Sequence, residues 1–314
     1  MSAQIMLSTF NGEAFLEAQL DSLLEQDFSA VDIIIRDDGS TDRTPQILLG
    51  YSTIHRNIHV SLGRNIGYVK SFFTLLAQAS PDADFFAFCD QDDIWMSDKV
   101  SCAVEFLQER PSTIPLAVCG GATIVNSELG ELGQLPPPRK PLSFLNALVE
   151  CPLLGCTLVI NRATRELLLR AVPERAYSHD WWVYLLVSAF GEILYDPRPR
   201  LLYRQHPANY FGSCPQLSLR RPFQCSTLLL RQWQQSLLRF LRQGSQQMVM
   251  QQAREFHHIY RCLLPSNCLR ELEHFLGSQD SLLSRIDYAW RGSAHRHSAF
   301  STLIMKLLVA AKRL

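Results

Sequence analysis

Three carboxylates stand within four residues in Asp90-Gln91-Asp92-Asp93, directly after the apolar run Phe85–Cys89. Carboxylate oxygens are the ligands that Mg²⁺ and Mn²⁺ prefer in proteins, and a cation held by them can bridge phosphate oxygens. The other interpretation is an acidic surface loop in which Asp93 caps a helix that begins near Ser97. The position directly after a predicted buried strand favours the cation site.

Polar segments also follow three earlier apolar runs. They are Ser8-Thr9-Phe10-Asn11-Gly12-Glu13, Arg36–Asp42 and Gly63–Gly67. Their hydroxyl, amide and carboxylate groups suit hydrogen bonding to a nucleotide or a sugar. Within the second segment, Asp38 is expected to order the turn that follows it, and Gly39 to supply backbone freedom. For Asn65 and Gly67 a plain turn explains the residues as well as a ligand contact does.

The apolar runs themselves predict a parallel β-sheet. They cover Gln4–Ser8, Val31–Ile35, Ile58–Leu62 and Phe85–Cys89. Between them, Leu16–Leu24 and Phe72–Ala79 place apolar residues at helical spacing, and Asn11 is a candidate cap of the first helix. Strand, helix, strand is the rhythm of an α/β fold. Because such sheets bind ligands beyond the carboxyl ends of their strands, we expect the polar segments to meet in one negative crevice.

The later part of the chain predicts further elements and a change of character. We expect helices over Asp98–Leu107, Arg162–Ala171 and after His179, and strands over Leu116–Val125, Leu153–Ile160 and Leu201–Gln205. From about Leu217, Gly and Pro become rare while Leu, Gln and Arg recur at helical intervals. These patterns predict an α/β domain over residues 1–213 and a basic helical extension over 214–314.

Charge and composition limit the class of protein. The net charge is zero, yet residues 1–150 hold 9 basic and 20 acidic side chains, whereas residues 151–314 hold 21 and 10. The acidic half suggests a cation site and the basic half an anionic partner. Nine cysteines without a C-x-x-C pair indicate reduced thiols. We see no signal peptide and no apolar run of membrane-spanning length, which predicts a cytoplasmic protein.

Taken together, three of these blocks resemble the family 2 glycosyltransferases, which are inverting enzymes of the GT-A fold. The blocks are Ser8–Glu13, Asp37–Asp42 and Asp90–Asp93, in this order and spacing. The form Cys89-Asp90-Gln91-Asp92-Asp93-Ile94-Trp95 is most similar to rhamnosyltransferase-like members that build bacterial surface polysaccharides such as O-antigen and capsule. The resemblance covers roughly residues 4–210 and implies a mainly parallel sheet flanked by helices, with the helical extension added.

The resemblance implies roles for the residues of the three blocks. The first block and Asp37 would line the base and ribose pocket, which points to Ser8, Thr9, Asn11 and Glu13. An Asp at this place can accept a hydrogen bond from the ring N–H of uracil or thymine and favours UDP or dTDP. The alternative is that Ser8, Thr9 and Glu13 form hydrogen bonds at the start of the first helix.

The third block resembles the family's DxD motif. Asp90 would contact ribose or the donor sugar, and Asp92 would hold the Mg²⁺ or Mn²⁺ that bridges the two phosphates. Near the end of the matched region, Tyr203-Arg204-Gln205-His206 resembles the family's late positive segment. Arg204 would hold phosphate, and His206 would be a further metal ligand or a structural residue.

Inversion needs a base that removes the proton of the acceptor hydroxyl. The family carries it in a Glu-Asp pair at the start of a late helix, which matches His179-Asp180 here, so Asp180 is the candidate. The alternative for Asp180 is a helix cap. His179 replaces the usual Glu, and it either tunes the pKa of Asp180 or caps the helix. The following pair Trp181-Trp182 offers a ring for stacking on a sugar, although at least one ring is expected in the core.

The tail suggests a partner. Residues 214–314 hold 14 basic and 5 acidic side chains. The segment Ser298–Arg313 is mainly apolar, with basic residues spaced along it. That segment is expected either to lie on the inner face of a membrane that carries a lipid-linked acceptor, or to pack on the catalytic domain. No nucleic-acid-binding module is visible.

These inferences predict a metal-dependent, inverting glycosyltransferase of the hexosyltransferase type. It would move a sugar, rhamnose being suggested by resemblance, from a nucleoside diphosphate to a glycan or lipid-linked glycan. A catalytically silent binding or scaffold protein with the same fold is the rival.

Overall fold

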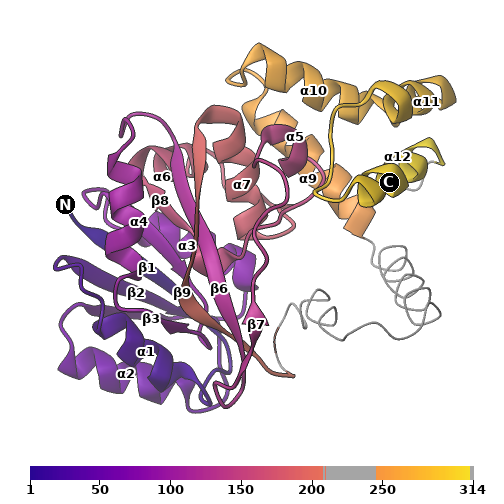
Figure 1. Cartoon of the computed structure of the whole chain (residues 1–314). Helices are drawn as coiled ribbons and strands as arrows, with labels where there is room; N and C mark the ends of the chain where they lie inside the picture. The colour runs from indigo at the N-terminus through magenta and orange to yellow at the C-terminus, as the bar shows by residue number, and fades with distance from the viewer. Residues whose placement is uncertain (208, 210–244, 312–314) are drawn as a thin grey trace, which may run out of the picture.

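The computed structural model describes residues 1–207, 209 and 245–311, which form an α/β part and a set of C-terminal helices (Figure 1). The expected boundary near Cys214 lies outside the described residues. The α/β fold with a helical C-terminal region is confirmed. Within the described residues the seven cysteines are free, as expected for reduced thiols.

The first half of the sheet follows the sequence pattern closely. Its strands are β1 (Ala3–Thr9), β2 (Val31–Asp37), β3 (Ile58–Leu62) and β4 (Phe85–Cys89). They pair in parallel in the order β3-β2-β1-β4. The helices between them are α1 (Leu16–Leu24), α2 (Thr44–Ile54) and α3 (Tyr68–Gln78). Because all four strands run in one direction, their carboxyl ends meet at one edge of the sheet.

The second half of the sheet makes it mixed, with four parallel and four antiparallel pairings in all. Its strands are β5 (Ile94–Trp95), β6 (Leu116–Asn126), β7 (Glu131–Gln134), β8 (Val159–Asn161) and β9 (Glu192–Gln205). The sheet continues β4-β8-β6-β9-β5, and β7 pairs with β6. The mainly parallel arrangement therefore holds only for the N-terminal half, because β8 enters beside β4 in the opposite direction.

Two predicted strands have different lengths in the structure. The expected strand Leu153–Ile160 is mostly irregular, with a 3-10 turn (η1, Gly155–Thr157) before β8. The Thr157 hydroxyl donates to the Leu154 carbonyl at 2.8 Å and stabilises that turn against extension. The expected short strand Leu201–Gln205 is the end of the long β9, which begins at Glu192 because β6 offers it a partner along its whole length.

The remaining helices cover both faces of the sheet. They are α4 (Lys99–Gln108), α5 (Phe144–Ala147), α6 (Arg162–Leu168) and α7 (His179–Phe190). One core holds apolar residues of α1 and α4, and the other holds those of α3, α6 and α7. The second core continues into the C-terminal helices, which include Phe256 and Tyr260. The α/β part and the C-terminal helices thus share a core.

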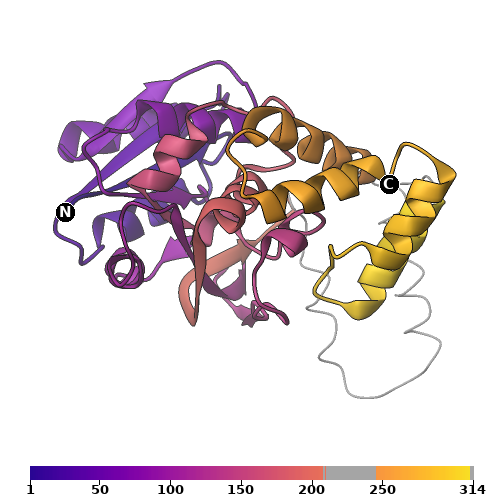
Figure 2. The same cartoon turned by 90° about the horizontal axis from the view of Figure 1, so that it is seen from above.

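The C-terminal helices are α9 (Ser245–Tyr260), α10 (Ser266–Gly277), α11 (Leu282–Arg291) and α12 (Ala299–Ala310). The ring of Phe256 in α9 lies 5.5 Å from that of Trp182 in α7. Figure 2 shows that α11 and α12, drawn in yellow, lie at the end of the molecule opposite the N-terminus. In the described residues, none of the helices is both long and apolar enough to cross a bilayer.

Candidate active site

Asp37, at the end of β2, organises the turn that follows its strand. Its side chain is buried and accepts hydrogen bonds from the Thr9 hydroxyl at 3.0 Å and the Ser40 N–H at 2.9 Å. The Gly39 N–H and the Ser40 hydroxyl also donate to it. The expectation that Asp38 orders this turn is wrong, because Asp37 supplies all of these contacts. Gly39 has a φ of +85°, which confirms its predicted conformational role.

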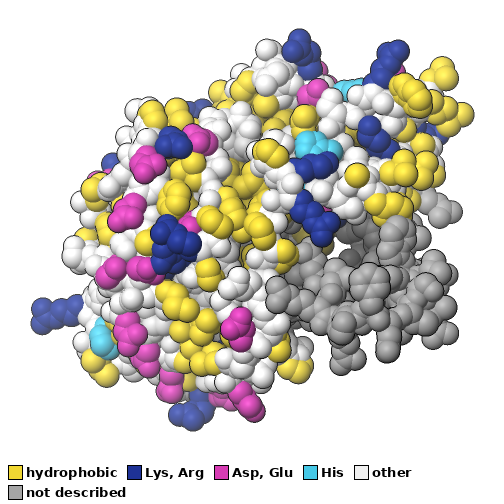
Figure 3. All heavy atoms as spheres, in the orientation of Figure 1, with side chains coloured by type: hydrophobic (Ala, Val, Ile, Leu, Met, Phe, Trp, Pro, Cys, Tyr) yellow, Lys and Arg dark blue, Asp and Glu magenta, His cyan; other side chains and the backbone are white. Residues whose placement is uncertain are grey.

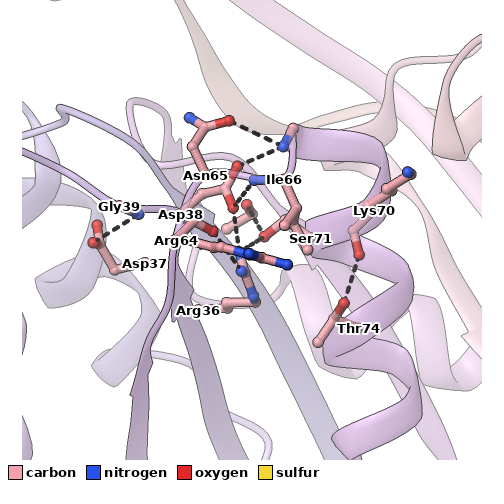
Figure 4. A network of polar contacts seen from close by, with 12 residues as sticks. Arg36, Asp37, Asp38, Gly39, Arg64, Asn65, Ile66, Lys70, Ser71 and Thr74 are labelled. Atoms are coloured by element: carbon pink, nitrogen blue, oxygen red, sulfur yellow. Dashed lines mark hydrogen bonds and ion pairs between the residues drawn. The ribbon is translucent and has the colours of Figure 1, made fainter.

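Asp38 instead joins β2 to the start of α3. Its carboxylate forms a buried ion pair with Arg36 and accepts the Ile66 and Gly67 N–H groups at 2.9 Å each. Figure 4 shows this network between the strand end and the first turn of α3. Arg36 in turn donates to the Arg64 carbonyl at 3.0 Å. The Gly63–Gly67 segment therefore makes the hydrogen bonds of a turn, in agreement with the interpretation of Asn65 and Gly67 as turn residues.

The Asn11 and Glu13 side chains of the first polar block are hydrogen-bonded to the second block, while the Gly12 carbonyl accepts the Leu16 N–H at the start of α1. The Asn11 side-chain oxygen accepts the Thr41 N–H at 2.8 Å, and Glu13 accepts the Arg43 N–H at 2.8 Å. Helix α1 begins after Phe15, which makes no side-chain cap. The prediction that Asn11 caps the first helix is wrong, because its φ of 50° turns its amide towards the neighbouring loop.

Ser8 points towards α3 rather than across to the second polar block. Its hydroxyl donates to the Ser71 hydroxyl at 2.7 Å, and Ser71 also accepts from Arg36 at 3.3 Å. Ser8, Thr9, Asn11 and Glu13 thus all lie at the edge where β1 and β2 end, as expected. Within the described residues, their hydrogen bonds run to neighbouring loops and helices and none of them caps α1.

The acidic block forms the loop between β4 and β5. Gln91 fixes it to the first block, because its side chain accepts the Phe10 N–H at 2.8 Å and donates to the Phe10 carbonyl at 3.0 Å. Burial raises the pKa of Asp90 to about 7, and the charges of Asp92 and Asp180 add to the effect. No sequence pattern predicts this role of Gln91, apart from its position between carboxylates.

Asp93 is fully buried beneath this loop. It accepts the Arg204 backbone N–H at 3.0 Å, and burial raises its pKa well above the usual range, with Asp92 and Asp90 adding to the shift. Helix α4 begins at Lys99 with Asp98 at its N-cap position. The alternative that Asp93 caps this helix is therefore wrong: burial beneath the loop carries its side chain to the end of β9.

Asp92 and His206 meet although 114 residues separate them. The Asp92 Oδ2 and His206 Nε2 atoms are 2.8 Å apart, and the side chains are 14% and 10% exposed. The Phe15 ring lies 4.6 Å from the imidazole, between ring centroids. A carboxylate oxygen and an imidazole nitrogen are ligand types that suit Mn²⁺, so this pair fits the predicted cation.

A second group of possible ligands lies deeper. Asp90, Asp93 and Cys156 place one ligand atom each within 4.8 Å of one another. Beneath them, the Lys99 ammonium is buried and stands 3.4 Å above the Trp95 ring. Burial lowers its pKa to about 8, and Cys89, Cys156 and Asp93 oppose that shift. Because Lys99 already supplies a positive charge there, the outer Asp92–His206 pair suits a divalent cation better.

Sequence reasoning missed Lys99 and Phe15 as parts of the site. Lys99 appears in the sequence as one lysine after an acidic segment, and Phe15 as one more apolar residue near the first helix. Nothing in that pattern indicates that the lysine would be buried or that the ring would contact His206.

Arg204 braces the acidic loop from behind. Its guanidinium donates to the Asp92 carbonyl at 2.7 Å and to the Ser127 carbonyl at 2.6 Å. It also stands 4.6 Å from the Phe15 ring, and only 4% of the residue is exposed. These contacts show a guanidinium that fixes the backbone beside the Asp92–His206 pair.

Asp180 lies in the first turn of α7. The cap of this helix is Ser178, whose hydroxyl accepts the Trp181 N–H at 3.4 Å. Ser178 is therefore the N-cap residue rather than His179, and from within the first turn the Asp180 Oδ1 atom also accepts the Trp181 N–H, at 2.9 Å. Asp180 is half-buried and close enough to Asp90 to raise the pKa of that carboxyl. The structure thus brings the candidate base to the acidic loop.

His179 lies behind Asp180 in an aromatic pocket. Its ring centroid is 4.1 Å from that of Phe72 and 5.1 Å from that of Phe88. Burial lowers its pKa to about 4, against a smaller opposing effect of Asp180. Both Trp181 and Trp182 are buried, and the Trp181 indole donates to the Ala147 carbonyl at 2.6 Å. Neither ring is placed to stack on a sugar.

Comparisons with known proteins agree with this arrangement. The chain is 28% identical to "dTDP-rhamnosyl transferase RfbG" of Shigella flexneri, over 72% of this chain and 80% of that protein. It is 25% identical to "UDP-Glc:alpha-D-GlcNAc-diphosphoundecaprenol beta-1,3-glucosyltransferase WfgD" of Escherichia coli, over 58% and 68%.

A solved structure and a family model complete the comparison. Residues 1–349 of S. aureus TarS, in complex with UDP-GlcNAc, match with a TM-score of 0.58 at 17% identity, over 99% of this chain and 91% of that one. That likeness supports the GT-A fold. Residues 4–163 match the model of glycosyl transferase family 2. With its acidic loop, candidate base and fold in one arrangement, the chain belongs to glycosyltransferase family 2.

Proposed function

We propose that the protein is a metal-dependent, inverting sugar transferase that uses a nucleoside-diphosphate sugar. One observation carries the proposal: Asp92, whose Oδ2 lies 2.8 Å from His206 Nε2, is on the same loop as Asp90, whose pKa responds to Asp180. This arrangement supports a site in which a cation, a carboxyl that contacts the donor and a base act together. This is the set of groups that transfer to a hydroxyl requires.

We propose that Ser8, Thr9, Asn11, Glu13 and Asp37 form the nucleotide pocket. Both Asp37 oxygens already accept two hydrogen bonds each. We therefore propose that Asp37 keeps the Gly39–Ser40 turn rigid and that this turn forms one side of the pocket for the base. A uridine or thymidine diphosphate is favoured, because the relative from S. flexneri is named for dTDP-rhamnose and TarS was solved with UDP-GlcNAc. Rhamnose is the sugar to test first.

In the proposed mechanism, Asp92 and His206 would hold Mg²⁺ or Mn²⁺, which when bound would supply Lewis-acid stabilisation of the departing diphosphate. Asp90 hydrogen-bonds a ribose or sugar hydroxyl, and Arg204 supports donor binding by fixing the backbone at Asp92. Asp180 Oδ1 accepts the Trp181 N–H at 2.9 Å, which directs Oδ2 to the acceptor hydroxyl, where it takes the proton as the anomeric carbon is attacked.

We propose that the acceptor is a glycan, carried on a lipid, in the synthesis of a bacterial surface polysaccharide. The name of the E. coli relative specifies a sugar on diphosphoundecaprenol. An acceptor of that kind would place the enzyme at the inner face of a membrane. The net charge of the acidic half makes nucleic acid an unsuitable ligand for the crevice.

The proposal is tested by nucleotide calorimetry. We expect UDP or dTDP, in preference to GDP and CDP, to bind with Mn²⁺ and to lose at least tenfold in affinity in Asp92→Asn or without the metal. Asp27→Asn, an exposed carboxylate away from the loop, is the matched control and should bind as wild type.

Transfer of the sugar to a short-chain acceptor then separates an enzyme from a silent scaffold. Metal-dependent binding without turnover on any tested donor and acceptor would favour the scaffold. The absence of nucleotide binding would contradict the proposed site.

A further inference from the structure

The helices α11 and α12 turn apolar side chains towards solvent. On α11, Leu283, Ile286 and Trp290 are 79%, 53% and 86% exposed. Their spacing of three and four residues places them on one face of the helix. The polar Tyr288 hydroxyl points inward instead, since that residue is only 1% exposed.

Helix α12 repeats the pattern beside α11. Phe300, Leu303 and Leu307 are 42%, 54% and 59% exposed, again at helical spacing. The opposite face of α12 packs into the core through Met305 and Val309. One face of α12 therefore packs on the protein, and the other face exposes apolar side chains to solvent.

The two stripes form one surface, because α11 and α12 pack against each other. Figure 3 shows hydrophobic side chains gathered at this end of the molecule, with basic side chains next to them. Apolar surface costs free energy in water, so a continuous surface of large side chains marks a place where something binds.

The charges around this surface favour an anionic partner. Residues 282–311 carry four arginines and lysines against one aspartate. The Arg291 side chain is 75% exposed beside the α11 stripe, where it also forms an ion pair with Asp287 at 3.3 Å. Lys306 lies on α12 between Leu303 and Leu307 in sequence, and the sequence continues with Lys312 and Arg313. A second copy of the chain is a poorer occupant, because it would bring like charges together.

The uneven charge distribution along the chain would orient the protein on an anionic surface. Residues 1–150 carry 11 more acidic than basic side chains, so an anionic surface repels the α/β half while it attracts the C-terminal end. An apolar stripe that includes tryptophan, flanked by basic residues and lying parallel to the surface, is the arrangement of a helix that binds at a membrane interface.

We propose that α11 and α12 together form a docking surface for an anionic lipid bilayer. The inference deepens the proposed function, because it gives the enzyme a way to reach an acceptor carried on a membrane lipid. The apolar stripes enter the headgroup region, and basic side chains contact lipid phosphates at a gain of about fivefold in affinity per charge.

The test is sedimentation of the full chain with vesicles of phosphatidylcholine alone or mixed with phosphatidylglycerol. We expect strong binding to the anionic vesicles, weakened by salt, and little to the neutral ones. The double variant Ile286→Ser/Trp290→Ser should lose at least tenfold in vesicle affinity. Leu49→Ser/Ile54→Ser, which changes two exposed apolar residues of α2 by the same chemistry, should bind as wild type.

A second pair of variants tests the charge contribution. Arg291→Gln/Lys306→Gln should lower binding to anionic vesicles by roughly an order of magnitude. Arg56→Gln/Arg139→Gln, with two basic residues of the α/β part neutralised, should change it little. Trp290 fluorescence offers a direct signal, because its emission should shift to shorter wavelength on vesicles and the shift should vanish in Trp290→Phe.

Three results would overturn the inference. They are the absence of vesicle binding by wild type, unchanged binding by Ile286→Ser/Trp290→Ser, and a concentration-dependent dimer that this variant abolishes without any vesicle binding. The last result would assign the surface to a second copy. Failure of the proposed function is distinguishable: a chain that binds vesicles but transfers no sugar to a water-soluble acceptor would refute the enzyme activity and leave the docking surface intact.

Discussion

The crevice and the docking surface are held in place in different ways. In the crevice, carboxylates and amides fix one loop to the next, as Glu13 does at Arg43 and Gln91 at Phe10. The α11–α12 region attaches through a shared apolar core and through polar contacts, among them those of Glu150, which accepts from Arg296 at 3.1 Å and from the His297 N–H at 2.6 Å. Residues with recognisable motifs serve the first region, whereas the second depends on side chains that no motif describes.

The same comparison distinguishes residues that are expected to act in catalysis from residues that hold the C-terminal helices in place. Removing a charge in the crevice should change catalysis or loop geometry. Removing a contact near α12 should change how the helical end is held and leave the crevice intact. The following variants test that division, in order of decreasing effect.

Asp180→Asn should reduce kcat by about a thousandfold, because the amide cannot accept the acceptor proton. Nucleotide affinity and thermal stability should stay close to wild type, since Ser178 caps α7. Rate assays with a soluble acceptor, together with calorimetry, measure both quantities. Near-normal turnover in this variant would show that another group is the base.

Asp38→Ala should destabilise the fold by about 3 kcal/mol, because it leaves Arg36 buried without its counter-charge and removes the acceptor of two N–H groups of the α3 turn. Urea unfolding provides the measurement. Asp42→Ala, which removes a half-buried carboxylate in the same segment, should cost less. Equal losses would mean that the Asp38 network is not the main brace of the crevice.

His179→Leu should make the protein more resistant to acid. The pKa of His179 in the folded protein, about 4, lies below the ordinary histidine value of 6.5, so wild type loses stability as pH falls from about 6.5 towards 4. At pH 5 the loss amounts to roughly 2 kcal/mol, and the variant should lack it.

Unfolding curves at pH 7 and pH 5 check this expectation for His179. Turnover at neutral pH should stay within a few-fold of wild type, because the buried neutral ring packs on Phe72 and Phe88. A folded variant with hundredfold lower turnover would instead give His179 a part in the chemistry.

His297→Ala should have the smallest effect, a modest loss of stability that is confined to the C-terminal end. The His297 Nδ1 atom accepts the Lys140 N–H at 3.0 Å, which requires the neutral ring. Burial lowers the pKa of His297, so this contact is complete above pH 6.5 and weakens as pH falls through the folded pKa.

Hydrogen exchange of α11 and α12 measures the effect of His297→Ala. His297→Asn, which retains an acceptor near Nδ1, should restore most of the protection and remove its pH dependence. A large loss of turnover on a soluble acceptor in either variant would contradict the separation of the two regions.

Much of the fold could be predicted from local pattern. The runs Ile33–Ile35 and Phe85–Cys89 lie in strands because consecutive apolar residues suit a sheet that is covered on both faces. The stretch before β8 was predicted less well, because a long-range contact constrains it: a Cβ on Gly155 would lie 2.6 Å from His179 Nε2. A contact between residues so far apart leaves no local signal.

The sequence by itself determined the class of site: acids and amides at the ends of parallel strands, and a candidate base at the start of a late helix. The tertiary structure decided which of these groups meet. It paired Asp92 with His206, gave Asp37 the turn contacts expected of Asp38, buried Lys99 beneath the acidic loop, and turned the apolar faces of α11 and α12 outward. The physical reason is that local spacing specifies strands and helices, whereas burial and long-range pairing depend on how the whole chain packs.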